Sequence, residues 1–289
     1  MDAADHVLRC RNDVKPALAA DPAAEDPVRA TVEPEEHIRR YFQTLYDAWG
    51  HQHWWPAQSR LEVIVGAYLT QNTSWTNVER ALDSLRNARV LSVRGLRRTP
   101  RAKLERLIRS AGYFRQKAQR LKTFVRFLDE RYGGSLTRMF AQPTEELREE
   151  LLALNGVGPE TADSILLYAG NHPVFVVDAY TRRILERHQL IQAKAGYDQI
   201  RQLFERALAP VTEVSLDPNL ASPKPRAVAV GPRGSCHAPS PMSTAVRTPA
   251  VQVFNEMHGL IVGVGKNYCK KSQPSCEQCP LQKFLPGAQ

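Results

Sequence analysis

The sequence has no long hydrophobic run and few cysteines, and both absences exclude a class of protein. No apolar stretch reaches the roughly 18 residues that a membrane span needs. The first ten residues, MDAADHVLRC, lack the apolar core of a secretory signal. Five cysteines, an odd number, argue against a disulfide framework. We therefore expect a protein of the cytoplasm or nucleoid that has no membrane partner.

The alternation of apolar and polar residues that is typical of β-strands is also missing, whereas apolar residues recur with the periodicity of a helix. Beginning at Glu35, apolar residues recur at helical spacing through Trp49. The same spacing predicts further helices at about 61–70, 75–88, 101–110, 115–131 and 144–153. The sequence therefore predicts an all-α fold.

Two stretches break this pattern. Residues 1–34 are rich in Ala, Asp and Pro and are predicted to form a disordered tail. Residues 213–250 hold seven prolines with several Ser, Ala and Gly, and predict a flexible insertion between two helices.

The charge balance suggests a polyanionic partner. Lys and Arg number 39 against 30 Asp and Glu, a formal charge of +9. A basic protein of this size commonly binds nucleic acid, although charge alone does not decide the matter.

A glycine-rich turn between two helices predicts where such a partner would bind. A helix beginning near Thr144 ends in the turn LNGVG, residues 154–158, and Pro159 opens a second helix. Gly156 and Gly158 permit a tight turn. The outward N–H groups of such a turn and the positive end of the second helix would favour a phosphate. An ordinary helix–helix turn would have a similar sequence.

The segments LNGVGPETA (154–162) and VFVVDAYTRRI (174–184) together resemble the hairpin and catalytic loop of the endonuclease III superfamily, the helix-hairpin-helix DNA glycosylases. The resemblance covers roughly residues 36–212 and 251–285. It implies two helical domains that flank a DNA-binding cleft. One is a helical barrel, 61–170, ending in the helix-hairpin-helix. The other combines 35–60 with 171–285 and carries the catalytic Asp. The implied partner is damaged double-stranded DNA, bound by a monomer.

Asp178 is the candidate catalytic residue. It follows an apolar run and precedes a helical pattern, so it is also a typical helix N-cap. Glycosidic cleavage develops positive charge on the sugar, which a fixed carboxylate stabilises while it orients or deprotonates a water. Superfamily members that also cut the strand carry a lysine two residues after the last hairpin glycine, where this chain has Glu160. Because glutamate cannot form an imine, the sequence favours a monofunctional enzyme.

Four tryptophans fall between residues 49 and 75. The segment 53–75 resembles the 3-methyladenine glycosylase branch, which implies that Trp54, Trp55 and Trp75 line a base pocket; packing in a core is the alternative. The adenine-removing branch has its leaving-group acid where this chain has Ala67. We therefore expect a preference for alkylated purines, whose positive charge already activates them and attracts aromatic rings.

The resemblance also implies contacts with DNA. Gln71 would enter the gap left by a flipped base, and Arg115 and Lys117 in GYFRQKA (112–118) would contact phosphates. The hairpin would contribute Asn155, Gly156, Val157 and Gly158. For each charged residue, a merely solvated position is the alternative.

A cysteine cluster near the C-terminus is incomplete. Cys269, Cys276 and Cys279 match the spacing of the iron–sulfur members, but the fourth position is Leu285. Because cluster ligation normally takes four cysteines, we expect a degenerate loop, no [4Fe–4S] cluster and no other cofactor.

Three functions fit the sequence. The favoured one is a glycosylase of base excision repair that hydrolyses the N-glycosidic bond of an alkylated base with water. The alternatives are an endonuclease III-like glycosylase and lyase acting on oxidised pyrimidines, and a non-catalytic helix-hairpin-helix DNA-binding module.

Overall fold

The structure is a computed structural model that describes residues 33–214 and 237–287. All regular elements in these two ranges are helical, which confirms the predicted all-α class. The predicted tail falls almost entirely outside the described residues, and the first helix, α1 (Pro34–Trp49), begins at its end.

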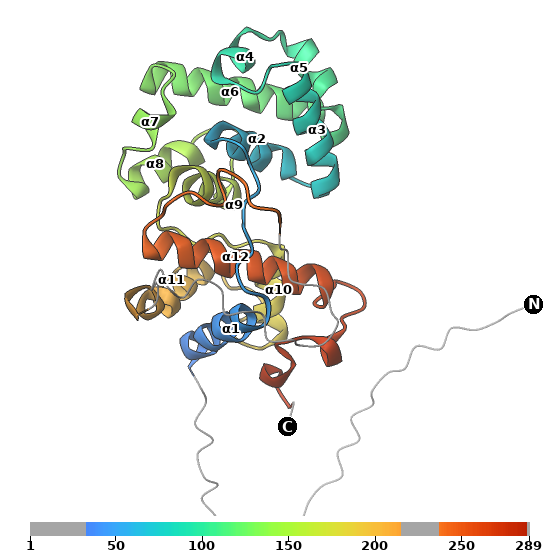
Figure 1. The fold of residues 1–289 in the computed structure, drawn as a ribbon, viewed down its shortest axis with the longest axis vertical. Helices are drawn as coiled ribbons and strands as arrows, with labels where there is room; N and C mark the ends of the chain where they lie inside the picture. The colour runs from blue at the N-terminus through green and yellow to red at the C-terminus, as the bar shows by residue number, and fades with distance from the viewer. Residues whose placement is uncertain (1–32, 215–236, 288–289) are drawn as a thin grey trace, which may run out of the picture. The chain divides into compact units, whose positions relative to one another are not determined.

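Two groups of helices make up the described unit (Figure 1). In one group, α1 contacts α11 (Tyr197–Val214) and α12 (Pro249–Asn267), and α10 (Ala179–Arg187) and α11 also contact α12. The helix η2 (Ile165–Gly170), a π-type segment, contacts both α2 (Arg60–Thr70) and α12 and so joins the groups. The first group comprises α1, α10 (Ala179–Arg187), α11 (Tyr197–Val214) and α12 (Pro249–Asn267). The second comprises α2 (Arg60–Thr70), α3 (Trp75–Asn87), α4 (Val93–Arg98), α5 (Arg101–Leu107), α6 (Phe114–Tyr132), α7 (Leu136–Met139), α8 (Thr144–Leu152), α9 (Pro159–Ser164) and η2 (Ile165–Gly170).

The helix boundaries follow local chemistry. Ser59 caps α2 through a hydrogen bond from the N–H of Glu62 to its Oγ, and Ser92 caps α4 in the same way. The six predicted helices are present with small shifts at their ends. The short helices α4 and α7 were not predicted, because six and four residues offer too little periodicity.

Helix α12 forms the centre of its group, since its residues from Val253 to Gly265 are all buried. Close neighbours require glycine at two of these positions. A Cβ at Gly265 would lie 2.2 Å from the Tyr180 ring, and one at Gly259 would lie 3.1 Å from the Cβ of Trp54. The glycines therefore allow α10 and the tryptophan segment to approach the helix closely.

The structure corrects the predicted insertion in part. Residues 237–250 form an ordered segment that packs against the chain before α2. The N–H of Met242 donates to the carbonyl of Ala57 at 3.1 Å, and Ser240 Oγ accepts from the N–H of Ala57 at 3.2 Å. Ser240 is buried, and its hydroxyl also bonds to Ser243. These hydrogen bonds satisfy buried polar groups, whereas the composition of the segment had predicted a flexible chain. Residues 215–236 lie outside the described residues.

An ionic network that is buried at Arg148 and Asp163 and exposed at Asp198 connects the two groups. Arg148 of α8 bonds to both carboxylate oxygens of the fully buried Asp163 on α9, at 2.7 and 3.2 Å. The same guanidinium reaches Asp198 of α11 at 2.8 Å. Close by, the hydroxyl of Tyr197 accepts a hydrogen bond from the N–H of Val177, at 3.2 Å. The network therefore ties both hairpin helices to α11.

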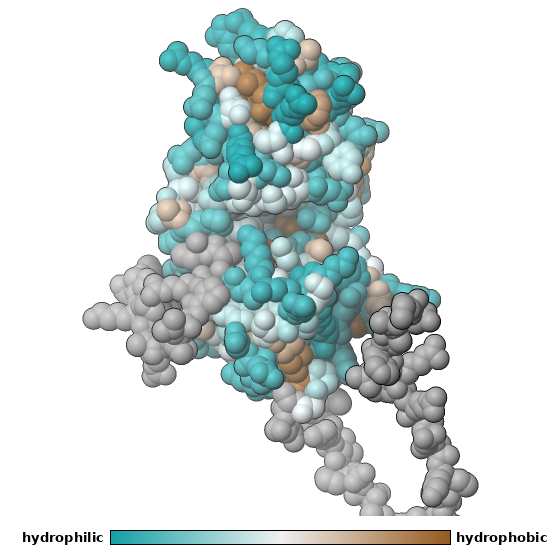
Figure 2. Space-filling view, turned by 90° about the vertical axis from the view of Figure 1, so that its right-hand side faces the viewer, coloured by the Kyte–Doolittle hydropathy of each residue, from teal (hydrophilic) through white to brown (hydrophobic). Residues whose placement is uncertain are grey.

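The surface is mainly polar. Figure 2 shows one face on which hydrophilic side chains predominate and hydrophobic ones form small patches. Among described residues, the large hydrophobic side chains classed as exposed are Tyr113 and Val246. No helix of this part of the chain is long and apolar enough to cross a bilayer.

Candidate active site and DNA interface

Asp178 occupies a fixed position at the start of α10. The preceding run, residues 174–177, is buried and delivers Asp178 as the N-cap. Its Oδ1 accepts hydrogen bonds from the N–H of Thr181 at 2.7 Å and from the Thr181 hydroxyl at 2.9 Å, which confirms the predicted cap. The side chain is only 12% exposed, and Oδ2 lies 3.7 Å from Nε2 of His258. One oxygen thus holds the helix, while the other faces a buried polar group.

His258 of α12 connects Asp178 to Tyr168. The Tyr168 hydroxyl and Nδ1 of His258 are 2.6 Å apart. Burial lowers the pKa of His258, so the ring is held neutral. Nε2 is buried and has no hydrogen-bond partner among described residues, with Asp178 beyond bonding distance. The arrangement leaves a buried polar atom directed toward the candidate catalytic carboxylate.

Glu160 is a second carboxyl group close to Asp178. It lies in the first turn of α9, immediately after the hairpin. Its side chain is exposed to solvent, and partial desolvation together with the charge of Asp178 raises its pKa. The sequence had indicated only that this residue is no lysine, and had identified no acid for the leaving group.

Lys266 is a further residue that the sequence analysis did not assign to the active site. Its ammonium lies 5.7 Å from the centroid of the Trp54 ring. Lys266 is exposed to solvent; partial desolvation lowers its pKa, and the nearby charge of Asp178 opposes this effect. Because Lys266 follows Asp178 by 88 positions, no local pattern could have connected them. A cation thus already lies near one of the rings predicted to attract a cationic base.

The three tryptophans form one cluster. The ring centroids of Trp54 and Trp55 are 5.6 Å apart, and those of Trp55 and Trp75 are 5.1 Å apart. Trp54 also lies 6.0 Å from the His258 ring, which brings the cluster to the neighbourhood of Asp178. Trp54 and Trp55 are 8% and 6% exposed, so most of each ring contacts protein. Their contact with a base stays a prediction.

The hairpin turn has the geometry that its glycines suggested. Gly156 has a φ of 80°, and the N–H of Val157 closes the turn on the carbonyl of Leu154 at 3.0 Å. The N–H groups of Gly156 and Gly158 have no acceptor in the described chain. A Cβ at Gly158 would have no neighbour within 4 Å, whereas one at Gly156 would lie 2.0 Å from Nε of Arg120. Gly158 is therefore the open side of the turn.

Gln71 is held against the hairpin. Its Nε2 donates to the carbonyl of Gly156 at 3.0 Å and to the hydroxyl of Thr161 at 2.9 Å. Its Oε1 accepts from Arg120 at 2.5 Å. Arg120 was not among the predicted DNA-contacting residues, although it connects the hairpin with Gln71.

A basic cavity lies beside the hairpin. It has a volume of about 440 Å³ and includes two of the predicted DNA-contacting residues, Arg115 and Asn155. Arg101, Arg120, Gln116 and Gln119 complete its lining. Three guanidinium groups around one open concavity suit an anionic backbone. Tyr113, 67% exposed and with a φ of 43°, projects from the same turn as Arg115.

Lys117 was wrongly predicted to contact phosphate. It is 1% exposed, and its ammonium donates to the backbone carbonyls of Leu69 and Ala111 at 2.9 and 2.8 Å. Burial lowers its pKa to about 8. The side chain therefore connects α2 to the turn before α6 and does not reach the surface.

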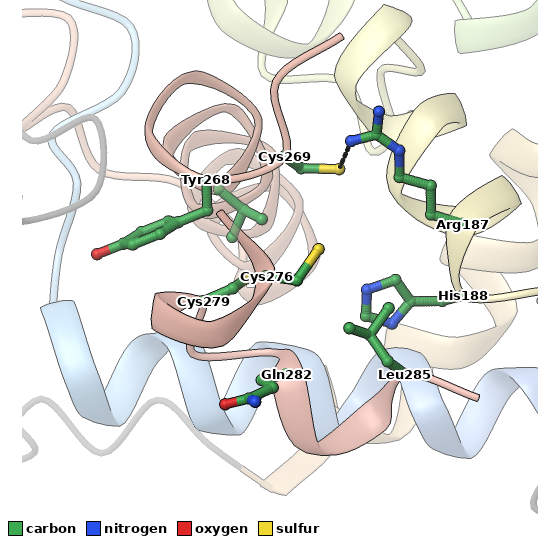
Figure 3. Close-up of a pocket in the computed structure, with 9 residues that line it drawn as sticks. Arg187, His188, Tyr268, Cys269, Cys276, Cys279, Gln282 and Leu285 are labelled. Carbon is green, nitrogen blue, oxygen red and sulfur yellow. Dashed lines mark hydrogen bonds between the residues drawn. The ribbon is translucent and has the colours of Figure 1, made fainter. Parts of the chain in front are cut away.

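Cys269, Cys276 and Cys279 line a small cavity together with His188 and Leu285 (Figure 3). Leu285 contributes an apolar side chain, and Cys269 Sγ accepts a hydrogen bond from Arg187 at 3.1 Å. Among the described residues, no group of three or more His, Cys, Asp or Glu side chains is arranged to hold a metal ion. The donor set does not fit a four-cysteine iron–sulfur cluster. The absence of a cofactor remains a prediction.

The hairpin, the capping aspartate after it and the all-helical fold together define a DNA glycosylase of the helix-hairpin-helix class. Residues 65–210 match the model of the HhH-GPD superfamily of base excision DNA repair proteins, and the chain belongs to this superfamily. A protein of Methanocaldococcus jannaschii described as a DNA repair glycosylase is 40% identical over 252 residues, which cover 86% of this chain and 96% of that protein.

Two further comparisons agree. Endonuclease III of Thermotoga maritima is 26% identical over 220 residues, covering 76% of this chain and 79% of the relative. The crystal structure of the H. pylori 3-methyladenine DNA glycosylase MagIII, bound to 1,N6-ethenoadenine, matches with a TM-score of 0.62 and 25% identity. The match covers 81% of this chain and 98% of that one.

Proposed function

We propose that this DNA glycosylase removes an alkylated base by hydrolysis, with water as the nucleophile and Asp178 as the catalytic carboxylate. The observation that supports the proposal is the placement of Asp178: a cap bond fixes Oδ1, and Oδ2 lies 3.7 Å from His258, whose ring is 6.0 Å from that of Trp54. A poorly solvated carboxylate in this position stabilises positive charge on the sugar. The similarity to the MagIII structure supports an alkylated substrate.

The absence of lyase activity follows from Glu160, which occupies the position of the nucleophilic lysine in the strand-cutting members. A carboxylate forms no Schiff base with the opened sugar. We therefore expect intact strands after base release, and breakage only after added alkali or heat.

Lys266 supports a second candidate, a glycosylase with lyase activity. The side chain is exposed and therefore accessible, and partial desolvation lowers the pKa of its amine, which increases the nucleophilic fraction. In this alternative a lysine from α12 replaces the usual lysine of the hairpin.

One experiment separates the two candidates. Duplexes carrying 7-methylguanine, 3-methyladenine or thymine glycol are incubated with the enzyme, and base release is measured separately from strand cleavage. Borohydride is added in parallel to trap an imine. Hydrolysis predicts release without a trapped complex. A trapped band that is lost in Lys266→Met would establish the lyase, and no release of any base would refute both candidates.

A further inference from the structure

We propose that His258 is a positioning residue for base removal. Tyr168 fixes the tautomer of its ring, and the ring directs an N–H group at Asp178, whose second carboxylate oxygen the helix cap leaves free. We expect two contacts, one on each oxygen, to fix the plane of the carboxylate beside the sugar. This inference rests on the proposed hydrolytic function and deepens it.

The ring of His258 has a fixed orientation. His258 is 4% exposed and lies within the buried stretch of α12. Three aromatic rings surround it, with centroids at 6.0 Å for Trp54, 5.9 Å for Tyr168 and 6.2 Å for Phe175. Phe175 is in turn stacked on Phe204, at a centroid distance of 4.1 Å. Because this interior is close-packed, the imidazole cannot turn over without displacing these rings, and each nitrogen keeps its own neighbour.

The neighbours of the two nitrogens select one tautomer. Nδ1 of His258 and the Tyr168 hydroxyl are 2.6 Å apart, and Nε2 lies 3.7 Å from Asp178 Oδ2. A proton on Nδ1 would leave the lone pair of Nε2 facing a carboxylate, which is repulsive. A proton on Nε2 turns the positive end of an N–H bond toward Asp178, and the Tyr168 hydroxyl then donates to Nδ1. The second arrangement is favoured on both sides of the ring.

Nε2 of His258 is a buried donor that still lacks an acceptor. It has no hydrogen-bond partner among the described residues, which is costly for a buried polar atom. Its distance to Asp178 Oδ2 exceeds that of a hydrogen bond by less than about 1 Å. Catalytic hydrogen bonds are often long in a free enzyme and shorten when the substrate binds. We therefore expect the substrate complex to close this contact, so that Thr181 holds one oxygen and His258 the other.

Burial of the ring preserves the negative charge of the carboxylate. Because desolvation lowers the pKa of His258, the ring is neutral at and above pH 7. A neutral donor positions Asp178 and leaves its charge for the sugar, whereas an imidazolium would cancel that charge. The charged groups that act on the ring are Asp178 of α10 and Lys266 of α12. Tyr168 of η2 has a raised pKa and stays uncharged near neutral pH.

The first test observes the tautomer directly by NMR. In protein that contains isotope-labelled histidine, the nitrogen chemical shifts distinguish a ring protonated at Nε2 from one protonated at Nδ1. The chain has eight histidines, and the signals that disappear in His258→Gln identify this ring. We expect the Nε2–H form in wild type and a mixture of tautomers in Tyr168→Phe. A wild-type ring protonated at Nδ1 would overturn the proposal, whatever the activity of the variants.

The second test compares two amides at position 258. Glutamine carries an N–H group at about the place of Nε2, whereas asparagine, one methylene shorter, reaches only the place of Nδ1. Single-turnover release of 7-methylguanine should fall about 10- to 100-fold in His258→Asn, as expected for a lost hydrogen bond to a charged group. His258→Gln should keep most of the rate, and both variants should bind an abasic duplex as tightly as wild type. Equal rate losses in the two variants, or a loss of binding that matches the loss of rate, would contradict the positioning role.

The third test is a double-mutant cycle. Tyr168→Phe should lower the rate about three- to tenfold in wild type but leave it unchanged in His258→Gln, where there is no tautomer to fix. A reduction of the same size in both backgrounds would show that Tyr168 acts through packing alone and would overturn the inference while leaving the proposed function intact. If wild type released no alkylated base, the proposed function would fail and the inference with it.

Discussion

Two substitutions of Asp178 separate its structural role from its catalytic role. Asparagine retains an oxygen that accepts the two bonds from Thr181, and it is as good an N-cap as aspartate. Alanine removes the cap and should cost about 0.5–2 kcal/mol of unfolding free energy. This corresponds to a fall in Tm of about 2–4 °C per kcal/mol for a domain of this size. Asp178→Asn should therefore unfold close to wild type and Asp178→Ala several degrees lower.

The catalytic loss should be the same in both variants. A carboxylate about 4 Å from a developing positive charge contributes roughly 4 kcal/mol at the intermediate dielectric that suits a side chain that is 12% exposed. That energy corresponds to about 10³-fold in the rate of base release. Binding to an abasic duplex should stay nearly constant, because the charge is stabilised mainly in the transition state.

The measurements are single-turnover base release and thermal unfolding, with Asp47→Asn, an exposed carboxylate of α1, as the control. If Asp178→Asn kept a tenth or more of the wild-type rate, the catalytic assignment would be wrong. If Asp178→Ala were as stable as Asp178→Asn, the cap would contribute less than its geometry indicates.

Three further predictions concern the DNA interface and the cysteine loop. Arg115→Gln should lower the slope of log affinity against log salt by about 1, as expected for a lost phosphate contact. Lys117→Met should leave that slope unchanged and reduce only stability, and equal effects of the two on the slope would contradict the observed burial of Lys117. Gly158→Ala should unfold within about 0.5 kcal/mol of wild type, since no atom lies within 4 Å of the added methyl, yet bind undamaged duplex about tenfold more weakly. Gly156→Ala should lower the free energy of unfolding by about 1–2 kcal/mol, because the backbone φ at this position is 80°. If Gly158→Ala bound duplex as tightly as wild type in a titration, the interpretation of Gly158 as the open side of the turn would be wrong. Protein purified without oxygen should lack iron and absorbance near about 400 nm, and stoichiometric iron would refute the absence of a cluster.

Local patterns predicted the parts of the site that local chemistry determines. The apolar run, the aspartate and the following helix specify a cap within a few residues, so the position of Asp178 could be predicted. The hairpin likewise follows from its glycines and Pro159. His258 and Lys266 could not be found in this way. Both come from α12, and only the packing of that helix against α10 and η2 brings them to Asp178.

Lys117 illustrates a different limit. It precedes the buried Leu121 by four residues, so it lies on the apolar face of α6. That spacing was a usable signal for burial, but the resemblance to a DNA-contacting turn outweighed it. Residues 237–250 are the reverse case, since a composition typical of flexible segments hides specific bonds between Ser240, Ser243 and Ala57.

The ion pairs of Arg148 have a mechanical consequence for how DNA is handled. They join both hairpin helices to α11, and Tyr197 joins α11 to the backbone just before Asp178. The separation between the hairpin and the carboxylate is thus set by the buried pair of Arg148 with Asp163, by the half-exposed contact of Arg148 with Asp198, and by the hydrogen bond from Val177 to Tyr197. Breaking the buried pair would cost several kcal/mol, so we expect a duplex that does not match this separation to bend. Lesions at easily deformed steps, such as pyrimidine–purine steps, would then be processed faster than the same lesions in stiff tracts, without any contact to the neighbouring bases.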